Sequence, residues 1–176
     1  MDLTRLPDQA PTRATKSLQY ADLDRALTAG VEKAMFTGMS SSDIPTNLDI
    51  AQSHPSKSCF VTVSVQPYYA TEPSAEGPAY YEKHRQSIQH ALAEDPCPLK
   101  AFGKLGLDYD RLNHADKGTQ IATFKAQLDM FVEEKWDLPL FLYCRTSFDD
   151  FVQVIGPYVE KLPRRGLVHS FVGTKA

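Results

Sequence analysis

Apolar residues along this chain fall into five short runs separated by segments with helical spacing. The runs cover residues 31–37, 59–66, 99–105, 138–143 and 166–171. Between the third and fourth runs, apolar side chains recur every three or four residues at Ile121, Phe124, Leu128 and Phe131, which is typical of a helix with one buried face. Strands that alternate with helices favour parallel βα units with right-handed crossovers. The pattern predicts an α/β domain and leaves open whether its sheet is doubly wound or part of a barrel.

The remaining segments complete this outline. Further helices are expected over about residues 20–30, 43–53 and 80–92, and another is expected to begin at Ser147 and to be interrupted at Gly156-Pro157. Residues 1–17 contain Pro7 and Pro11 and have no periodicity, so they are expected to form a loose tail. The prediction is therefore one α/β domain over residues 18–176.

Composition excludes several classes of function. The net charge is −3, so no basic surface is expected to draw nucleic acid over long distances. Cys59, Cys97 and Cys144 are widely spaced, as expected of reduced thiols inside a cell. No apolar run is long enough to cross a bilayer, and the polar N-terminus does not resemble a signal peptide. We expect an intracellular protein, cytoplasmic or nuclear, with no membrane partner.

Polar residues follow the predicted strands. The carboxyl ends of parallel strands share one edge of a sheet, where α/β folds place their chemistry. This edge should collect Thr37, Gln66, Lys104, Asp108, Tyr143, Arg145 and His169.

Each of these side chains also has a structural alternative. Asp108 could cap a loop, and Arg145 could pair with an aspartate instead of a phosphate. Tyr143 could be a core tyrosine, and His169 a hydrogen-bonded structural group. The sequence contains no HExxH, GxSxG or phosphate-binding glycine loop, and nothing in the spacing supports a triad from Ser170 or Cys144 with His169.

Three motifs carry a resemblance to a known family. They are AFGKLGLDYDR at residues 101–111, VHSFVGT at 168–174 and VSVQP at 63–67. The chain resembles the TatD family of metal-dependent deoxyribonucleases, especially its eukaryotic branch, over about residues 23–174. The resemblance implies a (β/α) TIM barrel, of which about five of eight strands are present here. It also implies two divalent ions, Mg, Mn or Zn, that hydrolyse DNA phosphodiesters.

The same resemblance indicates which residues stand at the family's metal positions. Lys104 replaces the bridging glutamate, Tyr143 replaces the histidine of the next strand, and Gln66 replaces the histidine of a glycine-x-histidine-proline element. His169 is retained, and an aspartate ligand of a later strand would follow residue 176. A unit charge at 4 Å is worth about 4 kcal/mol at an effective dielectric constant near 20, so an ammonium repels a dication strongly. We expect no bound metal pair and a TatD-like deoxyribonuclease homologue that is inactive or strongly impaired.

Two alternatives stay open. One is a metal-free phosphate or nucleic-acid binding protein that uses Lys104, Arg145 and His169, with Gln66 and Asp108 as further candidates. The other is a weak nuclease with one metal ion at His169 and Asp108. DNA is the expected partner in each case. An incomplete barrel also leaves two sheet edges that could support self-association.

Overall fold

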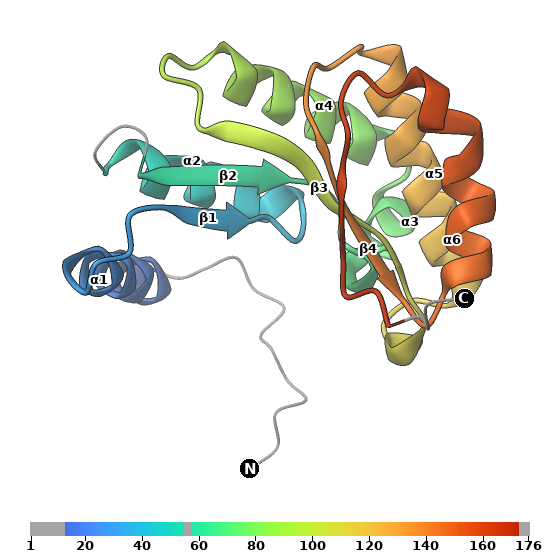
Figure 1. Ribbon diagram of the computed structural model, residues 1–176, viewed down its shortest axis with the longest axis horizontal. Coiled ribbons are helices and arrows are strands. Elements are labelled where there is room, and N and C mark those ends of the chain that lie inside the picture. Colours follow the sequence, from blue (N-terminus) through green and yellow to red (C-terminus); the bar gives the residue numbers. More distant parts are fainter. Residues whose placement is uncertain (1–12, 55–57, 173–176) are drawn as a thin grey trace.

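The five strands form one parallel sheet in which spatial order follows sequence order. In the computed structural model, which describes residues 13–54 and 58–172, β1 (Ala34–Thr37), β2 (Cys59–Val63), β3 (Leu99–Asp108), β4 (Leu140–Arg145) and β5 (Leu167–His169) are neighbours in that order. A doubly wound sheet would reverse its strand order at a switch point. The observed order therefore decides the question left open by periodicity, and the sheet curls into a half-barrel (Figure 1).

The helices lie mostly on the outside of this curl (Figure 1). They are α1 (Arg13–Thr28), α2 (Ile44–Gln52), α3 (Glu72–Glu76), α4 (Pro78–Ala93), α5 (Lys117–Glu133) and α6 (Phe148–Ile155). Short 3₁₀ helices are η1 (Ser41–Asp43), η2 (Pro67–Tyr69), η3 (Tyr109–Arg111) and η4 (Gly156–Lys161). None of the helices described is long and apolar enough to cross a membrane.

Two details of the sequence prediction need correction. The predicted tail is helical from residue 13 to 17, because α1 begins at Arg13, and residues 1–12 lie outside the described part of the chain. The segment between the predicted strand at 59–66 and the predicted helix at 80–92, to which no element was assigned, contains the short helix α3, with Pro73 in its first turn. The predicted interruption at Gly156-Pro157 is confirmed, since α6 ends at Ile155 and continues as η4.

The core lies between the sheet and the outer helices. Phe102 of β3 stacks on Phe131 of α5 with ring centroids 5.3 Å apart, and Trp136 packs against both rings. Leu105 and Leu107 of β3 are fully buried in the same layer. Because the side chains of a strand point alternately to the two faces of the sheet, the residues of β3 that lie between these core positions face the inside of the curl.

Two glycines bring β3 and β4 unusually close together. Gly103 (φ 149°) and Gly106 (φ 146°) adopt a backbone region that L side chains rarely occupy, and a Cβ at either would lie 2.0 Å from a β4 carbonyl oxygen. Gly106 lets the pairing continue to Asp108, three residues beyond the predicted end of this strand. A register shift between Gly103 and Leu105 leaves Lys104 out of the regular pairing.

The outer edge of the sheet is open in the described chain. Leu167 and Val168 of β5 are 63% and 41% exposed. Self-association through such an edge stays a prediction.

Candidate functional site

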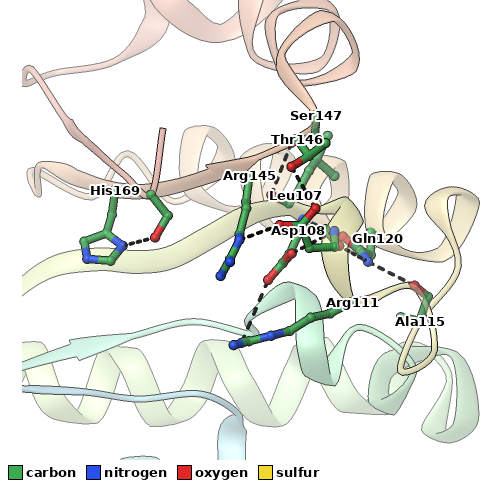
Figure 2. Close-up of polar contacts among 11 residues, drawn as sticks. Leu107, Asp108, Arg111, Ala115, Gln120, Arg145, Thr146, Ser147 and His169 are labelled. Carbon is green, nitrogen blue, oxygen red and sulfur yellow. Dashed lines mark hydrogen bonds and ion pairs between the residues drawn. The ribbon is translucent and has the colours of Figure 1, made fainter. Parts of the chain in front are cut away.

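The end of β3 is held in place by a buried glutamine. Gln120 of α5 accepts a hydrogen bond from the Asp108 backbone N–H at 2.8 Å. Its Nε2 donates to the Asp108 carbonyl oxygen at 3.0 Å and to the Ala115 carbonyl oxygen at 2.9 Å (Figure 2). The Asp108 carboxylate in turn accepts from the Asp110 N–H at 3.1 Å. Asp108 therefore caps η3, as its structural alternative predicted, while a role in phosphate binding stays a prediction.

A second glutamine, Gln127, holds the backbone just after β2 by the same pair of hydrogen bonds. Gln127 lies seven residues after Gln120, so the two share one face of α5. It accepts from the Val65 N–H at 2.7 Å and donates to the Val65 carbonyl oxygen at 2.9 Å, which sets the position of the neighbouring Gln66. Sequence reasoning did not assign this role to either glutamine. The available signal was the presence of two amides on a buried helix face.

Four of the predicted residues meet in one small pocket at the strand ends. The strand-end pocket, as we call it, is lined by Gln66, Pro67, Tyr68, Lys104, Asp108, Arg111 and Tyr143. Its volume of about 20 Å³ has room for one water-sized group, such as a single phosphate oxygen. Tyr68 and Arg111 were not predicted, because they come from turns after the strands rather than from the strands themselves. Thr37 does not line this pocket.

Lys104 is the most unusual member of the pocket. Its Nζ lies over the Tyr143 ring, 4.7 Å from the ring centroid. Burial and the nearby Arg111 guanidinium lower the pKa of Lys104, whereas Asp108 opposes this shift. Arg111 Nη1 lies 3.9 Å from Asp108 Oδ2. The pocket thus combines two cations with a single carboxylate.

The Arg145 guanidinium forms an ion pair with Asp110, outside the strand-end pocket. Its Nε donates to Asp110 Oδ2 at 2.8 Å, and Thr146 Oγ1 donates to Oδ1 of the same carboxylate at 2.8 Å (Figure 2). These hydrogen bonds from Thr146 and Arg145 lower the pKa of Asp110. The ion-pair alternative for Arg145 is confirmed, and its role as a phosphate ligand stays a prediction.

His169 lies beside Tyr143 on the exposed strand β5. The two rings stack with centroids 5.9 Å apart and an interplanar angle of 23°. His169 Nδ1 is 2.7 Å from the Oγ of the adjacent Ser170 (Figure 2). Cys144 is buried, and its Sγ lies 3.7 Å from Ser147 Oγ.

The strand order and the polar strand ends define this chain as a half-barrel of the (β/α) TIM-barrel type. Comparison with known proteins gives the family. The family model described as TatD related DNase matches residues 12–176. The chain belongs to the TatD family.

Named relatives agree with this assignment. The chain is 36% identical over 155 residues to a protein of Schizosaccharomyces pombe called Deoxyribonuclease Tat-D, covering 86% of this chain and 48% of the relative. It is 34% identical over 153 residues to an Erwinia tasmaniensis protein called 3'-5' ssDNA/RNA exonuclease TatD, and the match covers 87% of this chain and 54% of the relative. It thus spans about half the length of these relatives.

Solved structures show the same fold. A TatD family hydrolase from Entamoeba histolytica superposes with a TM-score of 0.73 at 24% identity, over 89% of this chain and 50% of that one. An uncharacterized amidohydrolase from Saccharomyces cerevisiae superposes with a TM-score of 0.67 at 25% identity, over 81% of this chain and 45% of that one.

The strand ends do not fit the metal pair that the resemblance implies. Within residues 13–54 and 58–172, no group of three or more His, Cys, Asp or Glu side chains could hold a metal ion. The polar groups next to the Tyr143 ring are the Lys104 ammonium and the His169 imidazole. Two dications require several carboxylates and neutral imidazoles, and an ammonium supplies no lone pair to them.

Proposed function

We propose that this chain is a TatD-type deoxyribonuclease homologue that does not carry out two-metal hydrolysis of phosphodiesters. The observation that carries the proposal is the position of the Lys104 ammonium, 4.7 Å from the Tyr143 ring centroid and beside the His169 stack. Metal-assisted hydrolysis needs bound cations to orient the phosphate and to activate water. A fixed ammonium at this point repels such cations. A cytoplasmic or nuclear location is part of the proposal.

The test is a cleavage assay with end-labelled single-stranded DNA. The purified protein is incubated with Mg²⁺, Mn²⁺ or Zn²⁺, with EDTA as the blank. We expect no release of nucleotides above the EDTA blank. Metal-stimulated release that is abolished by His169→Ala would overturn the proposal, because His169 is the retained family histidine.

A second candidate function is metal-free binding of a phosphate at the strand-end pocket. Lys104 and Arg111 both line it, and the one carboxylate among its lining residues is that of Asp108, which already caps a backbone N–H. The pocket therefore carries an excess of positive charge that a phosphate oxygen would neutralise. Arg111 takes the place that the sequence prediction gave to Arg145, since the Arg145 guanidinium is paired with Asp110.

Salt dependence distinguishes this function from nonspecific adhesion. In EDTA, affinity for a single-stranded oligonucleotide should fall with salt, and Lys104→Gln should weaken binding and reduce the salt slope by about 1. Lys161→Gln is a matched control, because Lys161 also lies over a tyrosine, Tyr158, but on η4. Affinity that is unchanged between low and moderate salt would exclude the candidate.

A further inference from the structure

Two aromatic rings from different turns stack next to the strand-end pocket. Tyr68 belongs to η2, which follows β2, and His114 belongs to the segment between η3 and α5. Their ring centroids are 3.6 Å apart, with an interplanar angle of 35°. Both residues are only partly buried. A half-exposed aromatic pair at the carboxyl end of a parallel sheet lies where α/β proteins bind their ligands.

The Tyr68–His114 pair lies next to the two cations of the strand-end pocket. Tyr68 lines the strand-end pocket together with Lys104 and Arg111. An aromatic surface therefore adjoins two cations within one small site. Proteins that bind single-stranded nucleic acid combine these two elements, cations for the backbone phosphates and aromatic rings on which bases stack.

Several other aromatic contacts of the described chain are buried and differ from this one. Phe102, Phe131 and Trp136 are buried in the core, and Tyr80 and His84 are buried under η1. The stack of Tyr143 on His169 offers a ring on its exposed side, but Lys104 lies against the Tyr143 ring. An experiment must separate Tyr68 and His114 from two competitors, the Tyr143–His169 stack and the Phe148–Phe171 pair, whose ring centroids lie 5.7 Å apart and whose residues are 55% and 50% exposed.

We infer that Tyr68 and His114 form a stacking surface for one base of a single-stranded nucleic acid whose phosphate lies at Lys104 and Arg111. This inference rests on the second candidate function above. The base must be unpaired, because a base inside a duplex keeps its faces against its neighbours and cannot reach a protein ring. The inference assigns a base-recognition role to two residues of turns, separate from the family's metal positions.

The experiment compares an oligonucleotide with bases to one without them. Affinities are measured by fluorescence anisotropy in EDTA for a labelled thymidine oligomer and for an abasic oligomer of equal length. Wild-type protein should bind the thymidine oligomer about fivefold more tightly or better, since stacking is worth about 1–3 kcal/mol per base. Tyr68→Ala and His114→Ala should each reduce this ratio toward one. Tyr68→Phe should keep it, because the ring rather than the hydroxyl makes the contact.

Further variants distinguish loss of base stacking from loss of phosphate binding. Lys104→Gln should weaken both oligomers to the same extent and leave the ratio unchanged. His169→Ala and, for the Phe148–Phe171 pair, Phe148→Ala should also leave the ratio unchanged. An unchanged ratio in Tyr68→Ala, or a ratio lost in His169→Ala instead, would overturn the stacking surface while leaving phosphate binding intact. If the wild-type protein binds neither oligomer, phosphate binding itself is overturned, and the stacking surface with it.

Discussion

The Lys104 ammonium lies 4.7 Å from the centroid of the Tyr143 ring. On the resemblance set out above, both residues occupy positions that carry metal ligands in the TatD family. A cation over a tyrosine ring is attracted by the ring's quadrupole, so the two replacements stabilise each other. On the proposed function, the Lys104 ammonium stands in for a bound cation at this site.

Reversing both replacements should create affinity for a divalent ion. The double variant Lys104→Glu with Tyr143→His places a carboxylate and an imidazole beside His169, and we expect Mn²⁺ binding at least about tenfold tighter than in the wild-type protein. Isothermal titration calorimetry measures this. Lys104→Gln with Tyr143→His is the matched control, because it removes the ammonium without adding a carboxylate. Equal Mn²⁺ affinity in the double variant, the control and the wild type would refute this account of the site.

The buried glutamine Gln120 should matter for stability because it holds the backbone of Asp108, which lines the strand-end pocket. Gln120→Leu leaves the N–H and the carbonyl oxygen of Asp108 without their partners, and each orphaned group costs about 1–3 kcal/mol. We expect a loss of about 3 kcal/mol in the free energy of unfolding, measured by urea denaturation. Gln89→Leu on the exposed face of α4 should change stability by less than about 0.5 kcal/mol. Similar losses in both variants would contradict the proposed clamp.

Glycine 106 is required by the close approach of β4. In Gly106→Ala the new methyl group would lie 2.0 Å from the Tyr143 carbonyl oxygen, and the residue keeps a φ of 146° that alanine disfavours. We expect a loss of more than about 4 kcal/mol in unfolding free energy, or no soluble protein.

The control for this variant is another glycine. Gly156 has a helical backbone (φ −47°, ψ −50°), and a Cβ there would meet nothing within 4 Å. Gly156→Ala should be neutral or stabilise the protein by up to about 1 kcal/mol. If Gly106→Ala unfolds at the same urea concentration as Gly156→Ala, the two strands are not packed as described.

Histidine 84 should make stability depend on pH. Its ring is buried, and burial lowers its pKa to about 4 from the 6.5 expected in the unfolded chain. The unfolded state therefore binds the proton first, so the stability contributed by neutral His84 is complete above pH 6.5 and is lost as the pH falls toward 4. Between pH 7.5 and pH 5, we expect a loss of about 2 kcal/mol from this residue.

Urea denaturation at the two pH values isolates this effect. His84→Phe should lose about 2 kcal/mol less than the wild type over that interval, whatever its stability at pH 7.5. An identical pH dependence in His84→Phe and the wild type would show that His84 is not held neutral in the fold.

Local patterns predicted the elements well and their contacts less well. The β-branched run at residues 59–66 marked β2, because burial on a strand depends on neighbouring residues. Ser147 marked the start of α6, although its hydroxyl donates to the Leu107 carbonyl oxygen instead of capping the helix. The order of the strands was left open, since periodicity reports which face is buried and not which strand lies alongside. Lys104 was predicted at the strand ends, but its contact with Tyr143 depends on the register shift beside Gly103, which no local pattern reveals.

The central claim is that the strand ends of this chain do not hold a divalent metal pair. It is tested most directly by thermal unfolding of the purified protein over a titration of Mn²⁺, because a ligand that binds only the folded state raises the unfolding midpoint. We predict a midpoint that does not change with Mn²⁺ concentration. A midpoint that rises with Mn²⁺ in the wild type and not in His169→Ala would contradict the claim.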